Sequence, residues 1–284
     1  MRVKELLREK LSSNELKFVP SSFDIVGSRS GAVAIVEFPP DSPDHVKRAV
    51  AEAIMAIHKN VRTVLAKRSE RRGVYRLREY EVLAGSGETE VVHKEHGVLM
   101  KVDPTKVYFS PREATERMRI ARQVKPGEFV MVMFAGVGPY ALAIAKTQPL
   151  VRRIVAIEIN PEAYRYMVEN IELNKLQDKI VPVLGDVRHE AARWYGMCDR
   201  VVMPLPRGAY KFLNEAVRSL RPRGGVIHFY HWSREGELFV EALYLVEREA
   251  LVHGMYARVL DARVVSPYAP RTYKVCIDTL IEPL

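Results

Sequence analysis

The stretch Phe129-Val-Met-Val-Met-Phe-Ala-Gly-Val-Gly-Pro139 decides the fold of this chain. Its apolar first half predicts a buried strand, and Gly136 and Gly138 predict a tight turn into the apolar helix that follows. Glycine lets the backbone approach a ligand closely, and the first turn of a helix offers amide hydrogens to negative charge. About twenty residues further on, at the end of the next predicted strand, Glu158 supplies a carboxylate able to bind both hydroxyls of a ribose. The spacing predicts a nucleoside-containing cofactor, and it leaves NAD open because Ala141 is tolerated in the dinucleotide motif.

Strands and helices alternate around this stretch, which is typical of an α/β sheet. Strands are predicted over residues 128–134, 153–158, 180–184, 200–204 and 225–230, with helices over 161–173 and 210–220. A final pair of strands, 256–266 and 272–281, is predicted to form a hairpin at the edge of the sheet. Residues 106–284 are therefore interpreted as one Rossmann-like α/β domain.

Residues 1–105 predict a smaller α+β domain that ends near Asp103-Pro104. After a short opening helix, strands are predicted over 23–27 and 32–38, followed by a helix over 44–58 with Asp44 as its N-cap. Two further strands, 80–83 and 90–93, are predicted to pair as a hairpin through Gly85-Ser-Gly87. A basic stretch precedes them and contains Arg62, Lys67, Arg68, Arg71, Arg72, Arg76 and Arg78.

The charge balance points to a polyanionic partner without identifying it. Among 284 residues, 44 Lys and Arg outnumber 35 Asp and Glu, and the net charge of +9 suits nucleic acid but also an ordinary solvated surface. Cys198 and Cys276 are too few for a disulfide framework or a cysteine-rich zinc site, so no metal is expected. The charged N-terminus lacks the apolar core of a signal peptide, and no apolar run comfortably spans a bilayer. A cytoplasmic protein that does not bind membranes is expected.

Further polar or rigid residues fall at predicted strand ends, where ligands of such folds bind. Asp186 is placed to accept a hydrogen bond from an adenine amino group or, equally, to cap the turn that follows. Asn160 and Pro161 predict the start of a helix. Pro204 and Pro206 predict a stiff loop, suited to holding a flat ligand or simply to ending a strand.

Together these segments resemble the archaeal and eukaryotic tRNA (guanine37-N1)-methyltransferases over nearly the whole chain. The resemblance implies S-adenosylmethionine as the cofactor, a class I Rossmann-like catalytic domain behind a smaller RNA-contacting domain, and the anticodon stem-loop of tRNA as the partner. Many members carry an extra N-terminal domain, and this chain is expected to start after it. The oligomeric state is not set by any motif, and a monomer is favoured. The motifs that carry the resemblance are, in chain order, Ser22-Phe-Asp-Ile-Val-Gly27, Tyr75-Arg-Leu-Arg-Glu79, His93-Lys-Glu-His-Gly97, Val107-Tyr-Phe-Ser-Pro-Arg-Glu-Ala-Thr-Glu-Arg117, Phe134-Ala-Gly-Val-Gly-Pro139, Glu158-Ile-Asn-Pro161, Asn170-Ile-Glu-Leu-Asn174, Asp186-Val-Arg188, Leu205-Pro206, Gly225-Val-Ile-His228 and Tyr268-Ala-Pro-Arg271.

The resemblance also implies roles for individual residues. Glu116 matches the general base that removes the N1 proton of guanine, and Arg76 matches the basic residue that orients that base and the glutamate. Tyr108 matches a residue near the methyl donor and the target, and Pro206 belongs to the loop at the target base. Glu158 is implied to bind the ribose and Asp186 the adenine. The full set of implied cofactor contacts is Arg117, Phe134, Ala135, Gly136, Gly138, Pro139, Glu158, Ile159, Asp186 and Val187.

The arginines around Glu116 allow another interpretation of that residue. Glu116 lies among Arg112, Arg117 and Arg119, so it could simply form ion pairs on a helix surface. The segments 62–78 and 112–122 are predicted to contact RNA phosphates.

Two positions depart from the family pattern and keep other functions open. Val132 stands where the family usually has Asp, and Pro204 stands where it usually has Asn. A contact to the methionine amino group and a contact to the target base are therefore expected to be lost, at a cost of about 1–3 kcal/mol each. One alternative is the sister family that transfers the 3-amino-3-carboxypropyl group during wyosine synthesis at the same tRNA position. Another is a catalytically impaired tRNA-binding paralogue.

Overall fold

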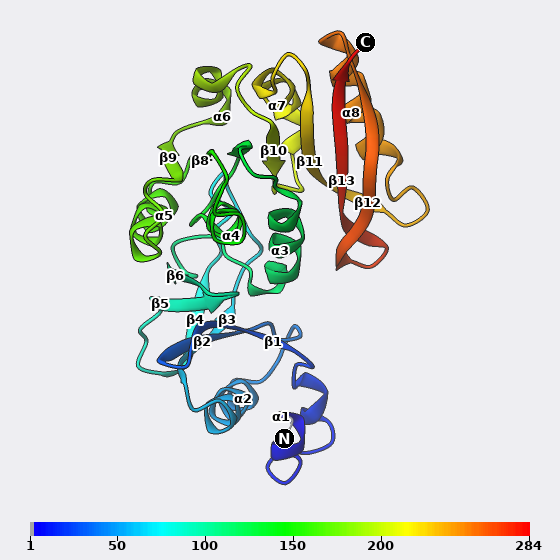
Figure 1. Cartoon of the computed structure of the whole chain (residues 1–284). Coiled ribbons are helices and arrows are strands. Elements are labelled where there is room, and N and C mark those ends of the chain that lie inside the picture. Colours follow the sequence, from blue (N-terminus) through cyan, green and yellow to red (C-terminus); the bar gives the residue numbers. More distant parts are fainter. Residues whose placement is uncertain (1–2) are drawn as a thin grey trace. The chain divides into compact units, whose positions relative to one another are not determined.

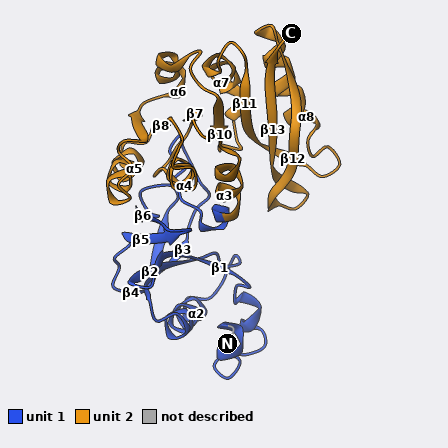
Figure 2. Cartoon of the chain, in the orientation of Figure 1, with its two compact units in different colours: residues 1–114 blue, residues 115–284 orange. Residues whose placement is uncertain are grey.

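The computed structural model describes residues 3–284, which divide into two compact units (Figure 2). The division follows Ala114, so that unit 2 runs from Thr115 to Leu284, whereas the sequence predicts a boundary at 105/106. Each unit has its own hydrophobic core. Over residues 3–284, every helix is too short or too polar to cross a bilayer.

Unit 1 is built on a four-stranded sheet with the order β1-β2-β3-β4 (Figure 1). Helix α2 (Asp44–Ile57) connects β2 to β3, which run parallel as such a crossover requires. The helix places Val46, Val50 and Ile54 in the core that it shares with the sheet. The remaining bounds are α1 (Val3–Leu7), the 3₁₀ turns η1 (Glu15–Phe18) and η2 (Pro111–Glu113), β1 (Phe23–Ser28), β2 (Gly31–Val36), β3 (Val61–Lys67) and β4 (Tyr80–Gly85).

The start of α2 differs from the sequence prediction. Pro43 is the N-cap, in an extended conformation, and no side chain caps the helix. Asp44 already lies in the first turn, where its carboxylate pairs with Lys47 at 2.9 Å. The prediction of Asp44 as N-cap is therefore wrong, although an acidic residue in the first turn still favours the helix.

The predicted hairpin of residues 80–83 with 90–93 is also wrong. Strand β4 pairs with β3, while β5 (Val91–Glu95) pairs with β6 (Val98–Val102) in a separate two-stranded sheet. His96 and Gly97 form the turn between β5 and β6, with φ of 46° and 80°. Two residues with positive φ match the twist of a hairpin, so this turn is the stronger hairpin signal.

Unit 2 contains a seven-stranded sheet with the order β12-β13-β11-β10-β7-β8-β9 (Figure 1). The five strands from β11 to β9 are parallel, and β13 and β12 run antiparallel at one edge. The prediction that the last two strands form an edge hairpin is confirmed. The strand bounds are β7 (Phe129–Val132), β8 (Arg153–Glu158), β9 (Ile180–Leu184), β10 (Arg200–Met203), β11 (Gly225–Arg234), β12 (Met255–Ala269) and β13 (Thr272–Pro283).

Helix α3 precedes the first strand of this sheet, and the other helices lie between its strands in the chain. Helix α5 starts as predicted, with Asn160 as N-cap accepting a hydrogen bond from the backbone N of Glu162 at 3.0 Å, and with Pro161 in the first turn. The bounds are α3 (Ala114–Gln123), α4 (Pro139–Thr147), α5 (Pro161–Leu173), α6 (Val187–Glu190), η3 (Ala191–Trp194), η4 (Ala209–Phe212), α7 (Leu213–Ser219) and α8 (Val240–Val252).

The order of the strands places a ligand site at the end of β7. From β7 the chain builds outward through β8 to β9, and it then returns to add β10 on the other side of β7. Such a reversal opens a crevice at the carboxyl ends of the strands, where open α/β sheets bind ligands. Every residue of β7 is buried, so the strand that leads into the glycine turn is central to the core.

Candidate active site

The turn after β7 holds backbone conformations that allow a ligand to approach closely. Gly136 and Gly138 have φ of 58° and 90°, and Gly138 is the N-cap of α4, with Pro139 as the first helical residue. A Cβ atom on Gly138 would lie 3.1 Å from Cγ of Met167. Phe134 also has a positive φ, 54°, which is uncommon for a bulky residue and is found most often at functional sites.

Glu158 ends β8 and is tied to this turn. Its Oε2 accepts a hydrogen bond from the backbone N of Gly136 at 2.7 Å, and its Oε1 accepts one from the backbone N of Asn160 at 2.8 Å. Burial raises the pKa of Glu158, and the backbone N–H donors oppose that rise. Each carboxylate oxygen still has a lone pair for a further donor such as a hydroxyl. The structure therefore brings the predicted ribose acceptor and the glycine turn together.

An aromatic pair is linked through Arg188 to Asp186. Phe134 meets Phe212 of η4 edge to face, with ring centroids 4.9 Å apart, and the Arg188 guanidinium lies 4.8 Å from the Phe212 centroid. Asp186 caps α6 by accepting a hydrogen bond from the backbone N of Arg188 at 2.9 Å. The Asp186 side chain is 25% exposed, so it can accept a further donor. Three other predicted cofactor contacts directly follow Phe134, Glu158 and Asp186 in the sequence and are buried or half-buried: Ala135, Ile159 and Val187.

Glu116 is buried in unit 2, with 8% of its surface exposed. Its Oε1 accepts the hydroxyl proton of Tyr230 at 2.6 Å, and its two oxygens accept hydrogen bonds from the Arg119 guanidinium at 2.7 and 2.8 Å. Pairing with Arg119 thus occurs, but in the interior and not on a helix surface. The prediction that residues 112–122 contact phosphates is wrong for Arg117, which is buried, and for Arg119, which is held by carboxylates.

A series of buried polar groups extends from Arg119, the partner of this carboxylate, into the sheet. Arg119 also pairs with Asp278 of β13, whose Oδ1 lies 2.7 Å from Nδ1 of His228 in β11. On the other side of the imidazole, Nε2 lies 2.6 Å from Nη1 of Arg200, which pairs with Glu128 at 2.7 Å. Because a guanidinium only donates hydrogen bonds, Nε2 must accept. His228 is therefore neutral and donates its Nδ1 proton to Asp278.

The pKa shifts of this chain agree with that assignment. Burial lowers the pKa of His228, and Arg200 and Arg119 lower it further, against the opposing effect of Asp278. Burial acts to raise the pKa of Asp278, but His228 and Arg119 together bring it well below its usual range. At neutral pH the pair is an ionised carboxylate beside a neutral imidazole.

Two tyrosines link Glu116 to the glycine turn. Tyr140, the residue after Pro139 in α4, donates its hydroxyl to that of Tyr230 at 3.3 Å, and Tyr230 donates to Glu116. Burial raises the pKa of Tyr230 well above its ordinary value, so its hydroxyl stays protonated. A continuous hydrogen-bonded path thus joins the candidate base to the start of α4.

Unit 1 contains two of the predicted catalytic residues, Arg76 and Tyr108, and brings them together. The guanidinium carbons of Arg71 and Arg76 lie 4.0 and 4.5 Å from the centroid of the Tyr108 ring. The Tyr108 hydroxyl donates to Glu113 at 3.3 Å. Arg71, which the sequence marks only as part of a basic stretch, is therefore an additional member of this group.

The two departures from the family pattern lie at the ends of central strands of unit 2. Val132 ends β7 and is wholly buried. Pro204 follows β10 in a turn closed by a hydrogen bond from the backbone N of Leu205 to the carbonyl of Met203 at 2.8 Å. Pro206 is buried in the same segment. An apolar side chain and a rigid turn thus occupy the positions expected to be polar.

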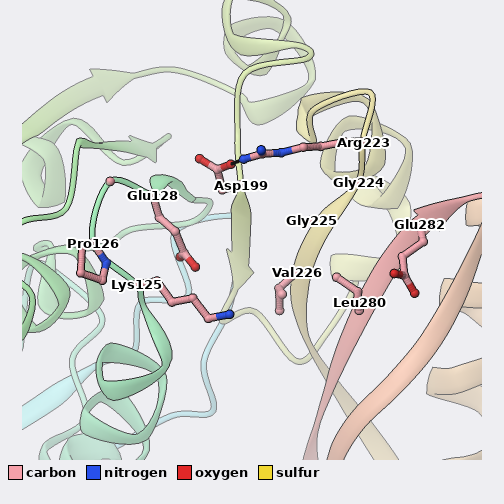
Figure 3. A pocket seen from close by; sticks show the side chains of 11 residues that line it. Lys125, Pro126, Glu128, Asp199, Arg223, Gly224, Gly225, Val226, Leu280 and Glu282 are labelled. Carbon is pink, nitrogen blue, oxygen red and sulfur yellow. Dashed lines mark hydrogen bonds and ion pairs between the residues drawn. The ribbon is translucent and has the colours of Figure 1, made fainter.

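A cavity of about 420 Å³ lies at the opposite edge of the sheet (Figure 3). Its lining includes Lys125 just before β7 and Asp199 just before β10, together with the first residues of β11 and the last part of the antiparallel β13. Figure 3 shows Arg223 reaching Asp199, a pair at 2.9 Å. The glycine turn and Glu158 instead follow their strands, so this cavity is separate from the candidate active site.

The parallel sheet, the glycine turn at its switch point and the buried acceptor at the end of β8 define a Rossmann-like methyltransferase fold. The chain belongs to the TRM5/TYW2 methyltransferase family. The TRM5/TYW2 methyltransferase domain matches residues 91–257, and the TYW2 N-terminal domain matches residues 3–89.

The chain is similar to relatives named for two different activities, methyl transfer and aminocarboxypropyl transfer. The tRNA (guanine(37)-N(1))-methyltransferase Trm5b of Pyrococcus abyssi is 42% identical over 262 residues, which cover 92% of this chain and 75% of the relative. The tRNA(Phe) (4-demethylwyosine(37)-C(7)) aminocarboxypropyltransferase of Pyrococcus horikoshii is 31% identical over 277 residues, which cover 98% of this chain and 95% of the relative.

Solved structures show the same two branches. The complex of aTrm5 with tRNALeu has a TM-score of 0.85 and 34% identity, covering 99% of this chain and 78% of that one. Methanocaldococcus jannaschii TYW2 in complex with AdoMet has a TM-score of 0.72 and 27% identity, covering 93% of this chain and 100% of that one.

Proposed function

We propose that this chain is an S-adenosylmethionine-dependent tRNA methyltransferase that acts on N1 of guanine 37. The observation that carries the proposal is the buried carboxylate of Glu116, fixed by Arg119 and Tyr230, in a chain 42% identical to a Trm5b enzyme. A general base must be held within hydrogen-bond reach of the proton that it removes, so its carboxylate has to be positioned before the substrate arrives. The hydrogen bonds to Glu116 meet that requirement.

The residues at the carboxyl edge fit S-adenosylmethionine. Glu158 would accept the ribose hydroxyls, and Asp186 would accept the adenine amino group, since both carboxylates retain acceptor capacity. The aromatic rings of Phe134 and Phe212 offer an apolar surface for a flat purine. When bound, the cofactor supplies an electrophilic methyl group.

Glu116 takes the proton that leaves guanine. Methylation would form a bond between N1 and the methyl carbon as the bond from that carbon to the sulfonium sulfur breaks and leaves its electron pair on sulfur. The N1–H bond breaks as well, and the Glu116 carboxylate accepts that proton. The Arg119 guanidinium holds both carboxylate oxygens of Glu116, and Tyr230 fixes one of them. A positioned base of this kind contributes about 10²–10⁴-fold in rate. Roles for Arg76, Tyr108 and Pro206 at the guanine belong to the same proposal.

The proposed partner is the anticodon stem-loop of tRNA. The net charge of +9 favours a polyanion, and a relative in this family has been solved with tRNALeu. A base in a single-stranded loop can leave its stack at modest cost. We also propose that the protein acts as a monomer in the cytoplasm, and sedimentation of the purified chain tests the oligomeric state.

Aminocarboxypropyl transfer is a second candidate function. The match of residues 3–89 to the TYW2 N-terminal domain favours it, as does the near-complete coverage of the P. horikoshii relative. The higher identity to Trm5b favours methyl transfer.

The experiment that decides between them uses cofactor labelled separately in its methyl and aminocarboxypropyl groups. Purified protein is incubated with tRNA carrying unmodified guanine 37 and with tRNA carrying 4-demethylwyosine. Methyl label in the guanine 37 tRNA supports the proposal. Aminocarboxypropyl label in the 4-demethylwyosine tRNA supports the second candidate. Methyl label found only in the 4-demethylwyosine tRNA, or tRNA bound without any transfer, contradicts both.

A further inference from the structure

Two aromatic rings stack at the far end of β11. The ring centroids of Trp232 and Tyr268 are 3.7 Å apart, with an angle of 27° between their planes. Tyr268 is nevertheless 54% exposed. One face of its ring is covered by the indole, so most of the exposed surface is on the other face and the edge. The pair therefore presents a flat aromatic surface to solvent.

Trp232 is connected to the candidate base through Tyr230. Trp232 follows Tyr230 by two residues on β11, so both side chains project from the same face of the sheet, about 6.5–7 Å apart along the strand. The Tyr230 hydroxyl contacts Glu116. Lys274, the partner of Trp232 on β13, places its Nζ 4.7 Å from the centroid of the Tyr230 ring, which confirms that these residues share a face.

Two arginines lie at the same end of the strands as the aromatic pair. Arg234 ends β11 and is exposed, and Arg271 lies in the turn between β12 and β13 with 87% of its side chain exposed. The nearest acidic contact of Arg271 is a loose pair with Glu235 at 3.8 Å. An exposed aromatic face beside exposed cations is an arrangement with which proteins bind single-stranded nucleic acid. The Tyr268–Arg271 motif contributes to the family resemblance but has no role in the site described above.

We propose that Trp232 and Tyr268 form a stacking platform for the RNA base next to the target guanine, with Arg234 and Arg271 meeting the flanking phosphates. The proposal rests on tRNA being the substrate. Successive nucleotides of a single strand are spaced closely enough for one base to reach Glu116 while its neighbour covers Tyr268. The platform would hold the loop open and so keep the target base out of its own stack.

The first test measures the affinity of tRNA with unmodified guanine 37 for three variants. Tyr268→Ala should weaken binding by about 5- to 100-fold, the loss typical of one base stacked on an aromatic ring. Tyr268→Phe keeps the ring and should bind within about twofold of the unsubstituted protein. Tyr244→Ala removes an equally exposed tyrosine from α8 and serves as the matched control, with unchanged affinity. Cofactor affinity should be the same in all variants, which shows that each is folded.

The second test identifies what the ring stacks on. Ligated tRNAs are prepared without a base on the 5′ side or on the 3′ side of guanine 37. With one of them, Tyr268→Ala and the unsubstituted protein should bind equally, because the stacked base is already missing. An effect of Tyr268→Ala that persists on both tRNAs, or no effect on the intact tRNA, overturns the platform.

These outcomes separate the platform from the proposed function. If the unsubstituted protein methylates guanine 37 and Tyr268→Ala binds tRNA normally, the platform fails while the proposed function stands. If no methyl reaches guanine 37 but Tyr268→Ala loses affinity for the intact tRNA and for only one of the two tRNAs that lack a base, the proposed function fails while the platform stands. A change in self-association of Tyr268→Ala, with unchanged RNA affinity, shows a protein contact and overturns the platform.

Discussion

The hydroxyl of Tyr230 lies 2.6 Å from Oε1 of Glu116 and donates its proton to that carboxylate, joining β11 to α3 in the interior of unit 2. Because burial raises the pKa of Tyr230 well above its ordinary value, the hydroxyl remains a donor throughout the physiological pH range. The position of the candidate base therefore depends on the sheet as well as on its own helix.

Replacing Tyr230 with Phe tests this dependence. The ring is kept and only the hydrogen bond is lost, so we expect the rate of methyl transfer to fall by about tenfold, which corresponds to about 1–1.5 kcal/mol. Single-turnover rates of methyl transfer measure the loss. Tyr244→Phe is the control, and an unchanged rate in Tyr230→Phe would show that the hydroxyl has no role in positioning.

Replacing Asp278 with Asn tests the buried chain behind Glu116. The substitution leaves Arg119 without one carboxylate partner, and breaking a buried pair in this way costs about 3–5 kcal/mol of unfolding free energy. Urea denaturation measures the loss. Asp178→Asn, which alters an exposed carboxylate, should change stability by less than about 0.5 kcal/mol.

The loss should depend on pH with a definite sign. The pKa of Asp278 is lowered in the folded state, so its carboxylate contributes stability above its unfolded pKa and loses that contribution as pH falls further toward the folded value. The difference between Asp278→Asn and the unsubstituted protein should be greatest near neutral pH and should shrink below about pH 4. A difference that grows on acidification would refute an ionised Asp278.

Glu158 is expected to make cofactor binding sensitive to acid. Its pKa is raised by burial, so protonation begins at a higher pH than for an exposed glutamate, and a protonated carboxyl accepts ribose hydroxyls less well. Affinity for S-adenosylmethionine, measured by calorimetry, should therefore fall as pH decreases through that raised value. Glu158→Gln should lose about 10- to 100-fold in affinity and show a flat pH dependence. Glu162→Gln, on the surface of α5, should behave like the unsubstituted protein.

The central part of the fold could be predicted because its signals are local. An apolar strand, two glycines and a proline stand next to each other in the sequence, and the same residues form β7, the turn and the start of α4. The pairing of strands could not be predicted from local signals in the same way. The segments at 80–83 and 90–93 were each correctly read as strands, but their partners are set by neighbours that a local pattern does not reveal.

Parts of the site could be predicted from the sequence, among them the glycine turn and its acidic residues. Glu158 was indicated by its spacing from the glycines and Glu116 by the family resemblance. The groups that hold Glu116 were not, because His228 and Asp278 lie fifty residues apart and meet only through the register of β11 with β13. A polar residue within an otherwise apolar strand is the one signal that marks such positions.

The most direct test of the central claim is the rate at which Glu116→Gln forms 1-methylguanosine at position 37 of tRNA in a single turnover. The amide keeps the shape of the side chain but does not accept the N1 proton, so the rate should fall by at least about 100-fold. Cofactor and tRNA affinities should stay within about threefold, and Glu162→Gln should retain the full rate. Normal formation of 1-methylguanosine by Glu116→Gln would contradict the account.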